Sequence, residues 1–329
     1  MKNATWLLSP LLLATAGLSA QTTHLTVDRT LAGGNAFNGP SGNLYVGETA
    51  GGVAVSGVDV DIVAGANVNG DLRARSDSRT TVWGGSFTSP ANGYPFGGLT
   101  VSQSARVRLN GPVTFGFTTV HDQASFTMDA GRIEGISVYS GHGSINGGLV
   151  LSQNSFTILQ AEGVGALLEL NGGTGAGAVR VAGLGLTRVT GGNYAMQHAL
   201  NGTIEILGGL PANGARLVAL HRPGALGRFT LVGSGFALSN PVAGSYYDPT
   251  YLISNPGVSF RLTGTLANGQ AIDASYFEEG LTLGQASTQM HFTTSAVPEP
   301  ASFLLMLLAG PVLLAAVRRR QRRIAASGG

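Results

Sequence analysis

The sequence predicts an all-β chain. We expect an irregular right-handed parallel β-helix (β-solenoid) with a C-terminal β cap, an N-terminal signal helix and one C-terminal transmembrane helix. Three observations support this fold class. The chain has 329 residues with 43% hydrophobic content, enough to fold around a core. Its apolar residues alternate in short sets, which is typical of strands. It contains 51 Gly, and Asn-Gly dipeptides recur between those sets, which predicts many tight corners.

The first segment, 1–20, reads as a secretory signal peptide. Lys2 precedes an apolar stretch from Trp6 to Leu18, and Ser19-Ala20 provides small residues for cleavage after Ala20. A buried N-terminal helix is the structural alternative. An exported domain of this size needs no disulfide to close its core, so the absence of Cys is compatible with secretion.

Segment 21–209 is the predicted solenoid. Its apolar sets suit strands with two or three inward positions, and no stretch keeps a helical period. The sets include Val58/Val60/Ile62, Leu99/Val101, Val113/Phe115/Phe117, Phe126/Met128, Leu149/Leu151, Val179/Val181 and Ile204/Ile206.

Asn-Gly marks the corners of this segment. The dipeptide starts at Asn38, Asn69, Asn92, Asn110, Asn146, Asn171, Asn201, Asn213 and Asn268. The mean spacing from Asn38 to Asn201 is about 27 residues, and three strands make a unit of about 30, within the range of solenoid coils. Asn-Gly between alternating sets is also the best short hairpin signal, so an antiparallel sandwich is the rival fold.

Segment 210–296 has a different texture, with five added Pro and longer strand sets such as Phe260 to Leu266. We expect a cap or small β-domain here, because the last coil of a solenoid otherwise presents an open sheet edge.

The formal net charge of +2 is unevenly distributed. Between Gln21 and Ala296, 13 Arg and no Lys stand against 16 Asp plus Glu, which leaves −3. The positive charge lies at the two ends of the chain. The body therefore lacks the general basic excess typical of nucleic-acid-binding domains, and we expect no nucleic-acid partner.

The segment 297–329 contains three parts in order. Val297, Pro298, Glu299 and Pro300 precede an uncharged run, 301–317, which is about 26 Å long as a helix and at the short limit for crossing a bilayer. A basic cluster follows within 318–323, and the positive-inside rule keeps it cytoplasmic, with the body on the far side. The cluster consists of Arg318, Arg319, Arg320, Arg322 and Arg323.

This arrangement resembles the PEP-CTERM sorting signal of Gram-negative bacteria. The resemblance covers about the last 33 residues, and it departs from the usual pattern in the extension from Ile324 to Gly329. It implies recognition by an exosortase, a membrane-embedded cysteine protease. The inner-membrane anchor would be transient, and the body would be released or attached at the cell surface, with possible partners in exopolysaccharide or biofilm matrix. An uncut membrane anchor is the alternative.

One tripeptide suggests catalysis. Gly141-His142-Gly143 resembles a catalytic-site motif of polygalacturonases, which are β-helix enzymes that cut polysaccharide with acidic residues. The acids that precede it, Asp122, Asp129 and Glu134, include no adjacent pair. We therefore interpret the tripeptide as a corner of the solenoid.

Other polar groups are equally ambiguous. Asp59 and Asp61 are spaced to share the outer face of one strand, where they could chelate a cation or remain solvated. Asn67 to Asp71 has part of a calcium-loop pattern but lacks its first and last acidic ligands. The six His have no metal-binding spacing. We expect no catalytic site, cofactor or metal, and a structural or adhesive role; a polysaccharide-degrading or carbohydrate-binding protein is the alternative.

Overall fold

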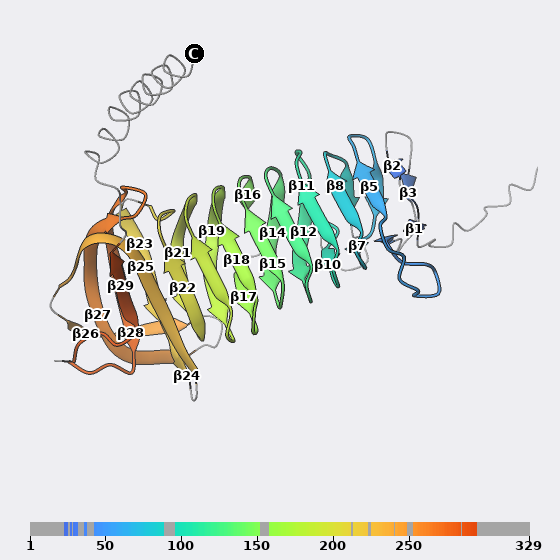
Figure 1. The fold of residues 1–329 in the computed structure, drawn as a ribbon. Coiled ribbons are helices and arrows are strands. Elements are labelled where there is room, and N and C mark those ends of the chain that lie inside the picture. The colour runs from blue at the N-terminus through green and yellow to red at the C-terminus, as the bar shows by residue number, and fades with distance from the viewer. Residues whose placement is uncertain are drawn as a thin grey trace, which may run out of the picture.

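The computed structural model describes residues 23–25, 27, 29–31, 36–37, 43–88, 96–151, 158–211, 213–222, 225–239, 241–248, 253–283 and 285–294. Every regular element among these residues is a β-strand. Figure 1 shows the strands as a row of coils that runs from β1–β3 to a wider C-terminal end formed by β25–β29. The prediction of an all-β, mainly parallel solenoid is confirmed for this part of the chain.

Each coil has three sides, and strands on the same side stack as a parallel ladder. The first side, here ladder 1, pairs each strand with the equivalent strand of the next coil. Its strands are β1 (Thr23–Leu25), β4 (Leu44–Val46), β7 (Leu72–Ala74), β10 (Leu99–Val101), β12 (Thr114–Val120), β14 (Arg132–Val138), β17 (Ile158–Glu162), β19 (Thr174–Ala182), β21 (Asn193–Ala199), β23 (Asn213–Ala219) and β28 (Ala271–Glu279).

The second side, ladder 2, is equally continuous and also parallel. Its strands are β2 (Arg29–Leu31), β5 (Asp59–Ile62), β8 (Arg79–Val82), β11 (Arg106–Leu109), β13 (Ser125–Met128), β15 (His142–Ile145), β18 (Leu167–Leu170), β20 (Leu186–Val189), β22 (Gly202–Ile206), β25 (Ala225–Leu238) and β29 (Met290–Thr294).

The third side, ladder 3, is less regular. It begins as a separate parallel sheet of β3 (Ala36–Phe37), β6 (Asn67–Asn69) and β9 (Ser86–Thr88). It continues through β16 (Leu149–Val150) and the first residues of β12, β14, β19 and β21. No ladder pairing joins β9 to β12, but the rings of Phe87 and Phe115 pack with their centroids 4.3 Å apart. Ring packing therefore bridges the break.

The coils are shorter than the predicted unit of about 30 residues. Paired positions in ladder 1 lie 28 and 27 residues apart from Leu44 through Leu72 to Leu99. From Leu99 to Leu217 the separations fall to between 18 and 23. In these shorter coils one strand often turns a corner and serves two sides, as β12 and β14 do, so fewer connecting residues are needed.

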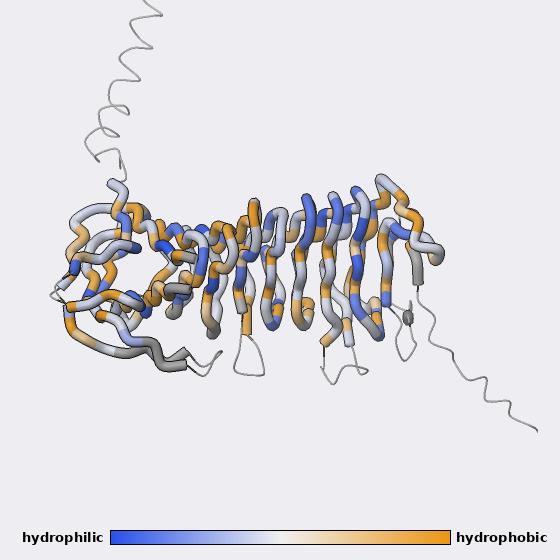
Figure 2. Tube along the Cα trace, turned by 90° about the horizontal axis from the view of Figure 1, so that it is seen from below, coloured by the Kyte–Doolittle hydropathy of each residue, from blue (hydrophilic) through white to orange (hydrophobic). Residues whose placement is uncertain are grey.

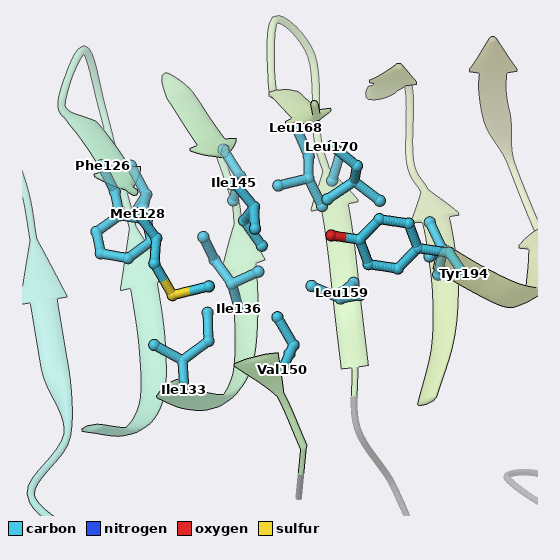
Figure 3. Packing of buried hydrophobic residues seen from close by; sticks show 14 of the residues in the cluster. Phe126, Met128, Ile133, Ile136, Ile145, Val150, Leu159, Leu168, Leu170 and Tyr194 are labelled. Atoms are coloured by element: carbon cyan, nitrogen blue, oxygen red, sulfur yellow. The ribbon is translucent and has the colours of Figure 1, made fainter. Parts of the chain in front are cut away.

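The core consists of side chains stacked from coil to coil. Figure 3 shows Phe126, Met128, Ile145 and Leu168 converging with others on one interior, and Figure 2 shows the matching alternation of hydrophilic and hydrophobic residues along the tube. Such stacking removes apolar area from water at both faces of each residue. The buried stack of ladder 2 contains Leu31, Ile62, Val82, Leu109, Met128, Ile145, Leu170, Val189, Ile206 and Leu231.

Two predicted inward sets are wrong in phase. Phe117 is 41% exposed, because the chain turns at Gly116 and places Thr118 inside instead. In β16 the buried residue is Val150, and the flanking Leu149 and Leu151 are only partly buried. A strand that turns a corner changes which alternate residues face inward, and strict alternation does not reveal the change.

Aromatic rings fill space that the aliphatic stacks leave. Tyr194 is fully buried beside Gly175, its neighbour in ladder 3, and its hydroxyl donates to the carbonyl of Gly172 at 2.6 Å. Burial raises the pKa of this phenol well above its usual range. The glycine on one coil thus makes room for the ring on the next.

The C-terminal region combines both sheet types. The parallel ladders continue past residue 209 into β23 and the first half of β25, and they end on β28 and β29. The antiparallel strands are β24 (His221–Arg222), β26 (Val242–Asp248) and β27 (Ile253–Leu266), with β27 pairing to β25, β26 and β28. The expected change of texture therefore corresponds to added antiparallel strands on an uninterrupted solenoid.

A buried carboxylate lies inside this end. Glu278 is fully buried at an inward position of β28, next to Ala219. Its oxygens accept hydrogen bonds from Tyr276 Oη at 2.7 Å, Ser287 Oγ at 2.6 Å, and both the amide and hydroxyl of Thr288 at 3.1 and 2.7 Å. These bonds attach the segment before β29 to the last rung of ladder 1.

Candidate functional site

The outer face of ladder 2 gathers the polar chemistry that the sequence left scattered. Alternation in β18 points Leu168 and Leu170 inward and leaves Glu169 on the outer side. The register then places Ser144, Glu169, Arg188 and Glu205 side by side on four successive coils. Because neighbouring strands are about 4.8 Å apart, side chains at matching positions reach one another directly.

Four of these outer side chains form a continuous set of contacts, here the charge chain: His142, Glu169, Arg188 and Glu205. His142 Nε2 lies 2.8 Å from Glu169 Oε2. Arg188 donates from Nη1 to Glu169 Oε1 at 3.3 Å and from Nε to Glu205 Oε2 at 2.6 Å. The hydrogen bond to Glu205 is the main cause that raises the pKa of Arg188 above its usual range.

A second polar row follows the corner at the end of these strands. We call it the amide row: Asp129, Asn146, Asn171 and Thr190. Asn146 Nδ2 donates to Asp129 Oδ1 at 2.8 Å, and Asn171 Nδ2 donates to Asn146 Oδ1 at 3.1 Å. Thr190 Oγ1 donates to Asn171 Oδ1 at 2.7 Å. Two of the predicted Asn-Gly corners are therefore members of one hydrogen-bonded row.

Asp129 also receives Arg108 from the preceding coil. Partial burial opposes ionisation of Asp129, but the hydrogen bonds from Asn146 and Arg108 outweigh it and lower the pKa of its carboxyl. The amide row therefore begins at an ionised carboxylate whose neighbours are already arranged to stabilise it.

The Gly-His-Gly tripeptide has three separate structural explanations. Gly141 turns a corner with φ +84°, as expected for a corner residue. Gly143 is an inward position of β15, where an added Cβ would press on Val138, Ile136 and Leu168. His142 alone faces outward, and its side chain is 41% exposed.

The acid beside His142 is one that the sequence analysis missed. Asp129 bonds to Arg108 and Asn146, and Asp122 accepts from the amide of Gln103 at 3.0 Å. Glu134 is buried in β14. The contact comes instead from Glu169, 27 residues after His142. The signal that identifies it is the register between β15 and β18, which requires the coil length to be known.

The charge chain is better built for holding than for bond cleavage. Glycoside hydrolysis needs one protonated and one ionised carboxyl flanking the bond. Here Arg188 bridges Glu169 and Glu205, and its charge favours the ionised form of both. An alternating row of charged donors and acceptors presents hydrogen-bonding groups along the solenoid axis, which suits a polar polymer.

The other sequence candidates are also on the page. Asp59 and Asp61 both face outward from β5, as predicted, and Asp61 Oδ1 accepts from Trp83 Nε1 at 3.4 Å. Asn67–Asn69 is strand β6, and Asp71 Oδ1 accepts from the amide of Gly98 at 2.8 Å. Among the described residues no group of three His, Asp or Glu side chains is placed to hold a metal ion.

The terminal signals lie outside the described residues. This applies to Ala20, to Val297, Pro298, Glu299 and Pro300, to the apolar run 301–317 and to the Arg cluster. Within the part of the chain that the structure describes, no helix has the length and apolar character needed to span a membrane. No protein-family model, curated protein sequence or solved structure matches this chain.

Proposed function

We propose that this chain is an exported, non-catalytic structural or adhesive protein of the cell surface or extracellular matrix. Its body would be a right-handed solenoid with a C-terminal cap, delivered by a signal helix and held briefly in the inner membrane by one transmembrane helix. The observation that carries the role of the body is the charge chain on ladder 2, in which Glu169 and Glu205 are bonded to Arg188. Such pairing favours a binding surface over acid–base chemistry.

The route to the surface rests on the two ends. The signal at 1–20 and the Arg cluster at 318–323 independently predict the same orientation, with the body outside the cytoplasm. The motif Val297–Pro300 begins three positions after Thr294, the last residue of β29. Two Pro within four residues favour an extended backbone, which is the form that protease grooves bind. We propose an exosortase as the processing partner.

Association with exopolysaccharide is supported by the composition of the outer faces. The amide row and the charge chain extend over neighbouring coils and offer side-chain amides, hydroxyls and charges at a spacing fixed by the sheet. Polysaccharide hydroxyls pair with such groups without chemistry. A rigid repeated surface also loses little conformational entropy on binding an extended polymer.

The experiment is an intact-mass measurement of the protein recovered from membrane and extracellular fractions of its own host. We expect loss of the signal peptide and of the tail after 297–300 in the extracellular form. Deletion of Val297 to Pro300 should leave a membrane-retained protein with its tail. Deletion of four residues behind the Arg cluster, 326–329, is the matched control and should be processed normally. Normal processing of the motif deletion would contradict the proposal.

A second candidate function is polysaccharide cleavage, favoured by the 2.8 Å contact between His142 and Glu169. A His oriented by a carboxylate is a recurrent acid–base pair. This candidate predicts that the protein releases reducing ends from acidic polysaccharides, and that His142→Ala and Glu169→Gln each abolish release. His121→Ala, which changes a His in the loop after β12, is the control. Absence of release from the intact protein would leave the non-catalytic proposal standing.

A further inference from the structure

Three arginines on neighbouring coils form an unusual exposed patch on ladder 2. This arginine patch consists of Arg79, Arg106 and Arg108. Arg79 in β8 is the direct register partner of Arg106 in β11, and Arg108 lies two residues further along the same outer face. Like charges directly opposite each other on adjacent strands destabilise a sheet. The patch holds three of the 13 arginines of the body, although the body has a net charge of −3.

The nearby acids do not neutralise the facing pair. Asp129 is bonded to Arg108 and Asn146, and Asp61 accepts from Trp83. Asp59 is the register partner of Arg79 on the preceding coil, yet no ion pair joins the two side chains. Within the described part of the chain, neither Arg79 nor Arg106 has an ion-pair partner. Two guanidinium groups are therefore left to bind an anion from solution.

An aromatic side chain stands beside this pair. Trp83 follows the last residue of β8, four positions after Arg79, and it is 49% exposed. Its indole N–H donates to Asp61 on the preceding coil, which orients the ring. An exposed indole of this kind offers a large apolar surface next to the charged groups.

We propose that the arginine patch and Trp83 form a binding site for an acidic polysaccharide built from carboxylated sugars. The planar guanidinium groups of Arg79 and Arg106 match carboxylates in bidentate geometry. Trp83 packs against the apolar face of a sugar ring, and the coil-to-coil direction gives the polymer a straight path across β5, β8 and β11. This inference rests on the proposed matrix function and names the chemical class of the polymer.

Trp83 makes the site directly observable. The chain has two tryptophans, Trp6 in the predicted signal and Trp83. In a full-length chain carrying Trp6→Phe, purified in a neutral detergent, all tryptophan fluorescence comes from Trp83. We expect a saturable change when polygalacturonate is added and no change with neutral dextran. The apparent Kd should rise steeply with NaCl concentration, because bound counterions compete for the arginines.

The decisive variant is the double substitution Arg79→Gln and Arg106→Gln. It should weaken polygalacturonate binding by about tenfold or more, since charge-assisted hydrogen bonds are lost. The matched control is Arg216→Gln with Arg228→Gln, which removes the same charge from exposed positions of β23 and β25 and should leave the Kd unchanged. Circular dichroism of both variants confirms that each retains the fold.

Several results would overturn the inference. These are equal loss of binding in the control variant, an unchanged Kd in the Arg79/Arg106 variant, and a response to dextran as large as that to polygalacturonate. Stronger binding to duplex DNA or to vesicles of anionic lipid would assign the patch to a different partner and also overturn it. Failure here leaves the export and processing proposal intact, because that proposal is tested by mass in host fractions and not by binding.

Discussion

The solenoid and the C-terminal antiparallel strands use the same dipeptide for different purposes. In the solenoid, Asn171-Gly172 turns a corner between ladders 2 and 3, and a Cβ on Gly172 would clash with the backbone oxygen of Asn146 on the preceding coil. Between β27 and β28, Asn268-Gly269 forms a hairpin, where Gly269 has φ +84° and no atom within 4 Å of an added Cβ. Close approach between coils requires the first glycine, and backbone conformation requires the second.

The two regions also differ in what fills their interiors. The solenoid stacks mainly aliphatic side chains, with occasional aromatic rings such as Tyr194. The last rung instead buries the carboxylate of Glu278 among four hydrogen bonds from three residues. An apolar stack tolerates small changes in volume, whereas a buried carboxylate requires each of its donors. The end of the molecule is thus more specifically joined than its middle.

The largest expected effect comes from Glu278→Ala. The substitution removes the shared acceptor and leaves the hydroxyls of Tyr276, Ser287 and Thr288 without it inside the cap. We expect the free energy of unfolding to fall by about 4 kcal/mol, because unsatisfied buried donors cost about 1–3 kcal/mol each and do not add fully. Urea denaturation followed by circular dichroism measures the change.

The conservative variant Glu278→Gln separates hydrogen bonding from packing. It keeps the volume and one acceptor oxygen, so its loss should be smaller than that of the alanine variant. A loss below about 1 kcal/mol for Glu278→Ala would show that the carboxylate network does not hold the end of the solenoid.

The next effect is Gly172→Ala. Because the added methyl group meets the backbone of the neighbouring coil and not a flexible side chain, the coils must separate locally. We expect a loss of about 3 kcal/mol, at the upper range for overpacking. Thermal unfolding compared with the parent protein measures it, and an unchanged midpoint would mean that the coils have room to move apart.

Gly269→Ala should have a smaller effect, about 1 kcal/mol. The new Cβ meets no neighbour, so the cost is the left-handed backbone conformation alone. Gly269→Asn is the matched control, since Asn tolerates this conformation, and it should be close to neutral. If Gly269→Ala destabilised the protein as much as Gly172→Ala, the distinction between the two uses of Asn-Gly would be wrong.

Much of the fold was predictable because its signals are local. The alternation of Val60 and Ile62 with Asp59 and Asp61 identified the two faces of β5, and the structure confirms both. The Phe117 and Leu149/Leu151 assignments failed where one strand serves two sides of the coil, since a corner changes the inward phase. The coil length failed because Asn-Gly occurs at more than one kind of corner, so its spacing does not measure one turn.

The candidate site was less predictable because it depends on register. His142 was visible in the sequence, but its partner Glu169 is 27 residues away and precedes Leu170, within an ordinary apolar set. Arg79 and Arg106, also 27 apart, become neighbours only when two coils are aligned. A sequence shows which residues face outward, whereas the length of each corner decides which of them meet.

The smallest expected effect compares two carboxylates, Asp129 in the amide row and Asp273 in the cap. Hydrogen bonds from Arg261 lower the pKa of Asp273, a fully exposed group, while Asp129 has the neutral donor Asn146 in addition to Arg108. Nuclear magnetic resonance titration should find both pKa values below the ordinary 3.8 at low salt. At about 1 M NaCl, where the screening length is about 3 Å, Asp273 should return toward 3.8 and Asp129 should stay lowered.

A lowered carboxyl pKa also fixes the sign of the pH dependence. The contribution of Asp129 to stability is fully present above pH 3.8 and is lost as the pH falls through its lower folded-state pKa. Asp129→Asn should therefore flatten the acid limb of the stability profile slightly, without moving the plateau by more than about 1 kcal/mol. Asn146→Ala should raise the pKa of Asp129 and leave Asp273 unchanged. Equal salt sensitivity of the two groups would mean that the amide row contributes nothing beyond the charge of Arg108.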